Sequence, residues 1–114
     1  MTRFEPGTVV LVRFPFTDLT GSKQRPGVVL SSDEHQRAGH DVIIAAISGQ
    51  GVDAPRVFDH VVENWASAGL IAPSVVRCGK LVTLERSMVR RVLGRIPSSG
   101  FRTIMARVKQ ALAA

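Results

Sequence analysis

The stretch TVVLVRFPFTDLTGSKQRPGVVLSS, residues 8–32, consists of two β-branched apolar runs with a polar loop between them. Residues 8–14 and 27–31 are predicted to be strands, because β-branched side chains suit a pleated, half-buried surface. Residues 15–24 contain Pro, Asp, Gly, Ser and Thr, which are typical of turns. Because Pro26 disfavours the helical region at the preceding residue, we expect Arg25 to be extended where the loop meets the second strand. A guanidinium held there is placed to meet a phosphate, but an ordinary surface arginine gives the same pattern.

The rest of the chain continues in short strands. Strands are predicted over residues 41–48, 60–63, 74–84 and 89–96, with a bulge at Gly79, and the polar residues 33–40 are predicted to be an exposed connection. Residues 64–70 are expected to form one helical turn that stops at Gly69. A C-terminal helix is expected after Ser98 or Ser99, with a buried face made by Phe101, Ile104, Met105, Val108 and Leu112.

This order predicts a mainly β, α+β fold: a small, strongly curved antiparallel sheet or SH3-like barrel with a C-terminal α-helix. The length of 114 residues predicts a single domain over 1–114. One cysteine, no apolar run long enough to cross a membrane and an N-terminus unlike a signal peptide favour a cytoplasmic location.

The formal charge of +6 is unevenly distributed. Residues 77–114 contain nine basic residues and one acidic residue, whereas residues 1–76 contain six basic and eight acidic residues. A basic half indicates a polyanionic or strongly acidic partner, although a solvated surface without a partner would have the same composition. Aromatic residues make up only 5% of the chain, so stacking on aromatic side chains is not expected to be the main way of holding nucleic acid.

The sequence excludes several kinds of site. His35, His40 and His60 are scattered without a cysteine or carboxylate at ligand spacing, so we expect no metal and no cofactor. Arg25, Ser48 and Arg77 remain, each at a strand end or beside a loop. Side chains of these kinds suit a phosphate group, whose negative charge they can neutralise. A guanidinium matches two phosphate oxygens, and a hydroxyl such as that of Ser48 can donate to a third.

The order of a strand, a polar loop, Arg-Pro, a strand and then a strand ending in a hydroxyl residue (IIAAISGQ) resembles the MazF/PemK family. These are the toxins of bacterial type II toxin–antitoxin pairs, and the resemblance runs from Gly7 to about Ala111. It implies a CcdB/MazF-like fold and a metal-independent, sequence-specific endoribonuclease of single-stranded RNA, an mRNA interferase. The implied products are a 2′,3′-cyclic phosphate and a 5′-hydroxyl.

The resemblance also implies catalytic residues. Arg25 matches the arginine of the family's Arg-Pro step, and Ser48 stands where the family has a threonine. The stretch VVRC at 75–78 resembles the PemK/Kid branch, which points to Arg77 as the third catalytic residue. That branch has an aspartate and a histidine where this chain has Gly79 and Ser22, so its His/Asp-assisted chemistry is not carried over and the general base is not identified.

Two loops, at 15–24 and 49–57, are expected to border the RNA groove. The candidate RNA-binding residues are Thr17, Asp18, Thr20, Ser22, Lys23, Gln24, Gln50 and Lys80. By the same resemblance the protein is expected to form a homodimer and to be inhibited by an antitoxin whose acidic tail occupies the groove.

Two other functions are compatible with the sequence. CcdB-type toxins use the same fold to poison DNA gyrase by contact, without nuclease activity, and a degenerate family member would only bind nucleic acid and autoregulate its operon. Arg25 together with a hydroxyl at position 48 favours cleavage, because a gyrase poison needs neither.

Overall fold

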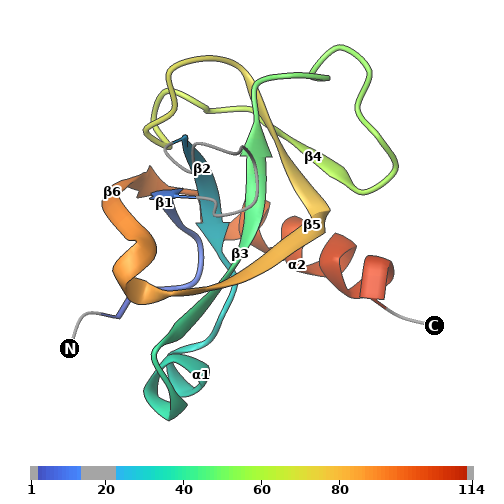
Figure 1. Cartoon of the computed structure of the whole chain (residues 1–114). Coiled ribbons are helices and arrows are strands. Elements are labelled where there is room, and N and C mark those ends of the chain that lie inside the picture. Colours follow the sequence, from blue (N-terminus) through green and yellow to red (C-terminus); the bar gives the residue numbers. More distant parts are fainter. Residues whose placement is uncertain (1–2, 14–22, 113–114) are drawn as a thin grey trace.

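The computed structural model describes residues 3–13 and 23–112. Its centre is a six-stranded antiparallel sheet in the order β4-β5-β3-β2-β1-β6 (Figure 1). A long helix, α2, follows the last strand, and a short helix, α1, lies between the second and third strands. The elements are β1 Thr8–Arg13, β2 Gln24–Val29, α1 Asp33–Ala38, β3 Asp41–Ser48, β4 Asp59–Val62, β5 Ser74–Glu85, the 3-10 turn η1 Arg86–Met88, β6 Val89–Arg95 and α2 Ser98–Leu112.

The predicted fold class is confirmed, and so are most strand positions. β3 has the predicted bounds and is buried along most of its length, as expected for a central strand. β5 has the predicted irregularity: Ala45 pairs with Leu81, whereas the next residue, Ala46, pairs with Arg77. Residues 78–80 are therefore extra on the β5 side, and they include Gly79. This bulge allows the long strand to bend around the sheet (Figure 1).

Two expectations were wrong. Residues 33–38 form α1 and not an exposed connection. The Ser32 hydroxyl accepts the N–H of His35 at 3.1 Å, which is an N-cap contact, and the helix buries Gln36 completely. In α2, Ile104 and Val108 are buried as predicted, but Leu112 is 70% exposed because the helix runs past the edge of the apolar cluster there.

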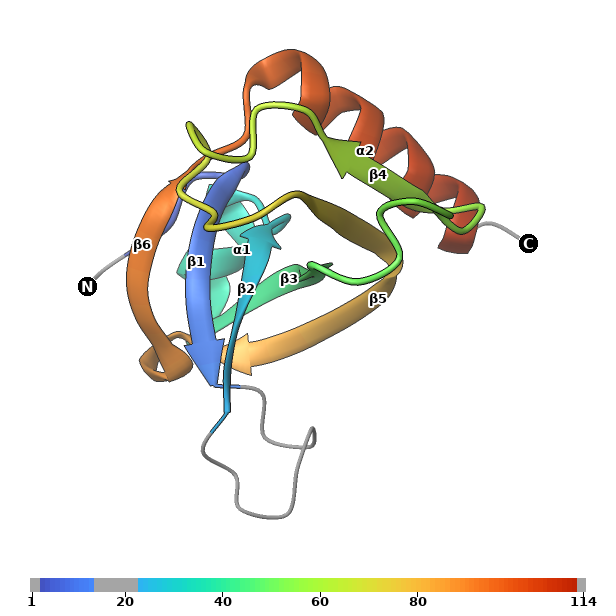
Figure 2. The ribbon, with the colours of Figure 1, turned by 90° about the horizontal axis from the view of Figure 1, so that it is seen from above.

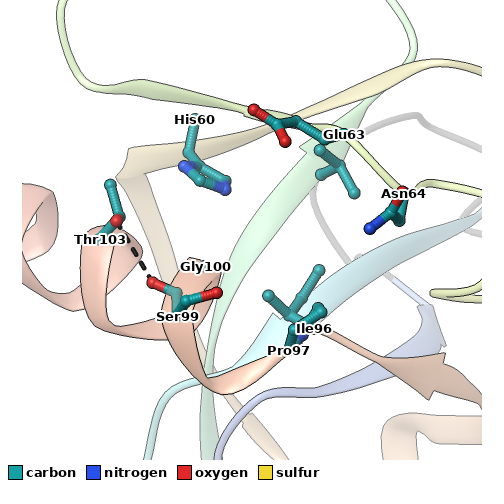
Figure 3. Close-up of a pocket in the computed structure, with 9 residues that line it drawn as sticks. His60, Glu63, Asn64, Ile96, Pro97, Ser99, Gly100 and Thr103 are labelled. Atoms are coloured by element: carbon teal, nitrogen blue, oxygen red, sulfur yellow. Dashed lines mark hydrogen bonds between the residues drawn. The ribbon is translucent and has the colours of Figure 1, made fainter.

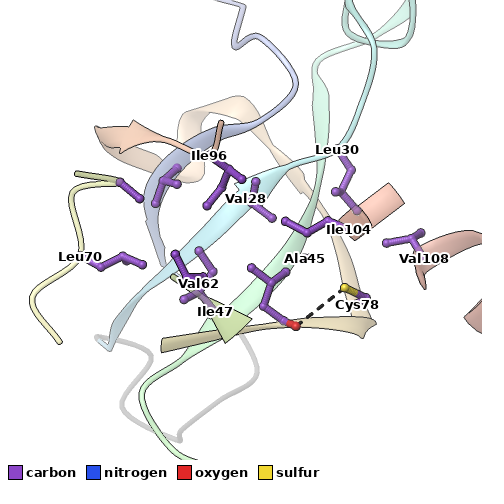
Figure 4. Close-up of a cluster of buried hydrophobic side chains, with 13 residues drawn as sticks. Val28, Leu30, Ala45, Ile47, Val62, Leu70, Cys78, Ile96, Ile104 and Val108 are labelled. Atoms are coloured by element: carbon purple, nitrogen blue, oxygen red, sulfur yellow. Dashed lines mark hydrogen bonds between the residues drawn. The ribbon is translucent and has the colours of Figure 1, made fainter. Parts of the chain in front are cut away.

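Apolar side chains cover both faces of the sheet. The larger cluster lies between the sheet and α2 and joins strand residues such as Val28, Ala45 and Val76 to Ile104 and Val108 (Figure 4). The smaller cluster lies on the opposite face, and it consists of Val10, Val12, Val29, Val42, Ile44, Ala46 and Leu84. Because successive residues of a strand point to opposite faces, β1, β2 and β3 contribute residues to both clusters.

The turn after β4 covers the edge strand β6. Ala68 donates its N–H to the Asn64 carbonyl at 3.1 Å, so one helical turn forms as expected, and Gly69 ends it with φ +86°. A Cβ on Gly69 would lie 2.0 Å from the Leu93 carbonyl oxygen, and one on Gly94 would lie 2.3 Å from the Ala68 carbonyl oxygen. Two glycines therefore let the turn pack against β6 and help to close the curved sheet, with α2 along one side (Figure 2). Within the described residues, neither helix is long and apolar enough to cross a membrane.

Candidate active site

Strand register brings the three predicted catalytic residues to the same face of the sheet. Arg25 pairs with Val12 of β1, and two residues further along β2, Gly27 pairs with Ala46 of β3. Ala46 in turn pairs with Arg77 of β5. Residues directly opposite one another, and residues two apart on one strand, share a face. Arg25, Ser48 and Arg77 therefore belong to the face of the smaller apolar cluster, at the end of β3 where that cluster stops.

Arg25 is exposed and extended, as its place before Pro26 predicts. At Arg25 and Pro26 the strand β2 pairs with β1, and its described pairing with β3 begins only at Gly27. A proline is tolerated there because it needs no ladder donor on the unpaired side. The Arg-Pro step thus puts a guanidinium on a regular strand that, at this point, pairs only with β1 among the described strands.

Ser48 is the last residue of β3 and is half-buried. Its Oγ accepts the N–H of Gln50 at 3.1 Å. A hydroxyl that accepts a hydrogen bond still has its own proton to donate. Ser48 is therefore held in place by the turn that follows it and can donate to a phosphate oxygen.

Arg77 has two anchors. Its Nη1 contacts the Asp59 carboxylate at 2.5 Å, and its Nη2 donates to the Gln50 carbonyl at 2.8 Å. The Arg77 side chain is 14% exposed and that of Asp59 is 4% exposed. A buried carboxylate needs such partners, since an unpaired charge in the interior is costly. Sequence reasoning missed Asp59, because only the pairing of β4 with β5 places it opposite Arg77.

The candidate RNA-binding residues are separated in the structure. Lys23 and Gln24 are exposed beside Arg25, and Gln50 is exposed just beyond Ser48, so these three border the same end of the sheet. Lys80 lies elsewhere, in the bulge of β5 next to Gly79, which faces Ala111 of α2. Thr17, Asp18, Thr20 and Ser22 lie outside the described residues.

The opposite face of the sheet carries two side chains whose pKa values are shifted, His60 and Cys78. A pocket of about 240 Å³ lies between β4 and the start of α2 (Figure 3). Burial, with a smaller contribution from Arg107, lowers the pKa of His60 in this pocket. Burial also raises the pKa of the Cys78 thiol to about 11, so Cys78 is a protonated core residue at neutral pH. Besides His60, the pocket is lined by Val62, Glu63, Asn64, Ile96, Pro97, Ser99, Gly100 and Thr103.

Metal ligands do not gather in the described part of the chain. Among residues 3–13 and 23–112 there is no group of three or more His, Cys, Asp or Glu side chains that could hold a metal ion. The chemistry that these residues offer at the Ser48 end of the sheet is therefore that of guanidinium groups, one hydroxyl and one buried carboxylate.

Comparison with known proteins identifies the family of this chain. The family model of the PemK-like, MazF-like toxin of type II toxin–antitoxin systems matches residues 5–112. The chain belongs to this family. No curated protein matches the sequence. The family match covers nearly the whole chain.

Solved structures of similar fold include members of the same family. The Mycobacterium tuberculosis toxin MazF-mt6 has 21% sequence identity and a TM-score of 0.71, over 91% of this chain and 94% of that chain. A MazE–MazF structure from Deinococcus radiodurans has 15% identity and a TM-score of 0.77, over 99% and 98%. A mycobacterial endoribonuclease in complex with its cognate antitoxin has 17% identity and a TM-score of 0.75, over 96% and 95%. At these identities the likeness shows a common fold.

Proposed function

We propose that this MazF/PemK-family toxin is a metal-independent endoribonuclease that cuts single-stranded RNA at a short sequence. The observation that carries the proposal is the strand register that puts Arg25, Ser48 and Arg77 on one face at one end of the sheet. Two guanidinium groups and a hydroxyl at one end of the same face suit a phosphodiester, because they offer several donors to its oxygens. A contact toxin without catalysis would not need this combination.

In the proposed reaction the 2′-oxygen attacks the adjacent phosphorus. The bond between the 2′-oxygen and phosphorus forms, the bond from phosphorus to the 5′-oxygen breaks, one proton leaves the 2′-hydroxyl and one is delivered to the 5′-oxygen. The products are a 2′,3′-cyclic phosphate and a 5′-hydroxyl. Arg25 stabilises the charge of the phosphorane, Ser48 donates to a phosphate oxygen, and the free N–H groups of Arg77 hold the phosphate. An arginine keeps its proton at neutral pH, so we assign Arg25 charge stabilisation and not the role of base.

The same proposal includes two protein partners, a second copy of the chain and an acidic antitoxin. Two observations support the antitoxin. Nine of the 15 basic residues lie in residues 77–114 with one acidic residue, so this part of the chain would attract an acidic segment. Two of the solved structures of the same fold, from Deinococcus radiodurans and from a mycobacterial species, were determined with an antitoxin.

The test is incubation of the purified protein with a long single-stranded RNA in excess EDTA, with cuts mapped by primer extension. We expect discrete cuts that share a short motif. Arg25→Ala should lower the cleavage rate by about 100-fold or more, since removing a donor to a developing oxyanion typically costs that much. Arg37→Ala is the matched control, because it removes an equal charge from the exposed surface of α1 and should leave the rate unchanged.

Three results would contradict the proposal. Wild-type rates in a folded Arg25→Ala variant would remove Arg25 from the site. Inhibition by EDTA that added metal reverses would show a metal-dependent reaction. Intact RNA after incubation with the folded, antitoxin-free wild type would indicate a toxin that acts by binding, and DNA gyrase would then be the next target to test.

A further inference from the structure

Arg77 joins the two ends of the loop 49–58, which connects β3 to β4 (Figure 1). Its Nη2 donates to the Gln50 carbonyl at the start of the loop, at 2.8 Å. Its Nη1 contacts the carboxylate of Asp59, the first residue after the loop, at 2.5 Å. One guanidinium thus fixes the separation between the beginning and the end of this loop.

Asp59 is the centre of the second attachment. The same carboxylate oxygen, Oδ2, also accepts the N–H of Arg56 at 2.9 Å, and the Asp59 N–H donates to the Arg56 carbonyl at 3.0 Å. The Asp59 carbonyl accepts from Nη1 of Arg107 on α2. Since Asp59 is 4% exposed, its charge depends on the Arg77 guanidinium and the Arg56 N–H, and its carboxylate holds both Arg77 and the last turn of the loop.

The first attachment depends on a glycine. Gly51 has φ +77°, and a Cβ there would lie 3.1 Å from Nη2 of Arg77. A side chain at position 51 would therefore strain the backbone and push against the guanidinium. The close approach lets Arg77 reach the Gln50 carbonyl, while the Gln50 N–H is held by the Ser48 hydroxyl. The backbone of Gln50 is fixed on both sides, so its exposed side chain projects from a defined position.

We propose that Asp59 is a positioning residue that sets, through Arg77, the conformation of the loop 49–58 and thereby the RNA sequence that is cleaved. This inference rests on the proposed ribonuclease activity. Arg77 would use its remaining N–H groups toward the phosphate while Asp59 holds its orientation. Base selection would come from the ordered loop, with Gln50 as the exposed loop side chain that lies just beyond Ser48. Asp59 itself does not touch the RNA.

The experiment compares cleavage at every mapped site of one long RNA by the wild type, Asp59→Asn and Gly51→Ala. Asp59→Asn keeps the size of the side chain and removes the charge that holds Arg77. Gly51→Ala disturbs the other attachment from an exposed position and leaves the Asp59–Arg77 pair in place. We expect both variants to lower the ratio of cleavage at the preferred sequence to cleavage at related sequences by about tenfold.

Two matched controls should keep the wild-type ratio. Asp41→Asn makes the same chemical change at an exposed position at the opposite end of β3. Gly39→Ala makes the same change at a glycine with extended φ, where a Cβ would have no neighbour within 4 Å among the described residues. Hydrogen exchange of amides 50–56 in the RNA-free protein gives a second readout, and exchange should be at least about tenfold faster in Asp59→Asn and Gly51→Ala.

The outcomes separate the two proposals. If the wild type leaves RNA intact, the ribonuclease proposal fails, and the exchange measurement still shows whether Asp59 orders the loop. If the wild type cuts and the folded variants cut all sites in the wild-type proportions, the inference is overturned, whether or not the overall rate has fallen. If Asp59→Asn does not fold, Gly51→Ala alone decides, and an unchanged cleavage pattern in that variant overturns the inference.

Discussion

Two arginines at opposite ends of β5 make the same kind of contact with different consequences. Arg86, directly after β5, donates to the carbonyls of Gln36 and Gly39 at 2.7 and 3.2 Å. Arg77, near the start of β5, donates to the carbonyl of Gln50. Each guanidinium therefore joins a peripheral segment, α1 or the loop 49–58, to the same long strand.

The remaining partners differ. The carbonyls that Arg86 contacts lie at the C-terminal end of α1, where backbone acceptors are unsatisfied and carry partial negative charge. Arg77 also has a buried carboxylate, and it lies on the face of the sheet that carries Ser48 and Arg25. Arg86 therefore only attaches α1 to the sheet, whereas Arg77 has, in addition, the position that the proposed ribonuclease activity requires. Substitutions at Gln36 and Arg86 test whether the contacts at the α1 end serve stability only.

The largest effect on stability is expected at Gln36, which is completely buried at the α1 end. Its side-chain oxygen accepts the Phe4 N–H at 2.8 Å, and its Nε2 donates to the carbonyls of Phe4 and Ser31 at 2.6 and 3.2 Å. Gln36→Ala leaves these backbone groups unpaired, so the free energy of unfolding should fall by about 3 kcal/mol. Urea denaturation of the wild type and the variant measures this difference in unfolding free energy.

Gln110→Ala is the control for this change, because Gln110 is exposed on α2 and its loss should shift the free energy of unfolding by less than about 0.5 kcal/mol. The folded Gln36→Ala protein should keep the wild-type cleavage pattern. A changed pattern would mean that the α1 end influences the end of the sheet with Arg25, Ser48 and Arg77. It would contradict the claim that the contacts of α1 serve stability only.

The second effect concerns Arg86 itself. Arg86→Ala removes two charged hydrogen bonds to the carbonyls of Gln36 and Gly39, and we expect the free energy of unfolding to fall by about 2 kcal/mol with cleavage unchanged. Arg91→Ala, at an exposed position of β6, removes the same charge and should have little effect on either measurement. Arg86→Ala with wild-type stability would show that α1 is held by its other contacts alone.

The sequence predicted the fold well, because the strands have strong local patterns. β-branched runs identified β1, β3 and β5, and Gly79 marked the bulge of β5. α1 was missed because it is six residues long and mostly polar. Ser32 followed by Asp33 and Glu34 is a helix start signal that could have identified it.

The site was predictable only where one residue carried its own signal. Arg25 is extended before Pro26 and Ser48 is the last residue of β3, as their local patterns predict, and their catalytic roles stay predictions. Asp59 has no such signal, because its role depends on the register between β4 and β5. The same limit applies to Arg86, whose partners lie some 50 residues away in the sequence. Long-range pairing determines which of several similar charges are joined, and local pattern does not contain that information.

The smallest expected effect is on the pH dependence of the unfolding free energy. It should differ between His60, next to the loop 49–58, and His40, next to α1. Burial of His60 beside Arg107 lowers its pKa below the ordinary value of 6.5, although Glu63 acts in the opposite direction. The unfolded chain therefore binds a proton at this residue more readily, and the stability present above pH 6.5 is partly lost as the pH falls through the folded-state value.

His60→Gln should reduce the fall in unfolding free energy between pH 7.5 and pH 5, measured by urea denaturation at both values. His40→Gln, at an exposed position, should keep the full wild-type dependence. Equal pH dependence in the wild type and His60→Gln would place the acid sensitivity elsewhere, since no other residue was changed.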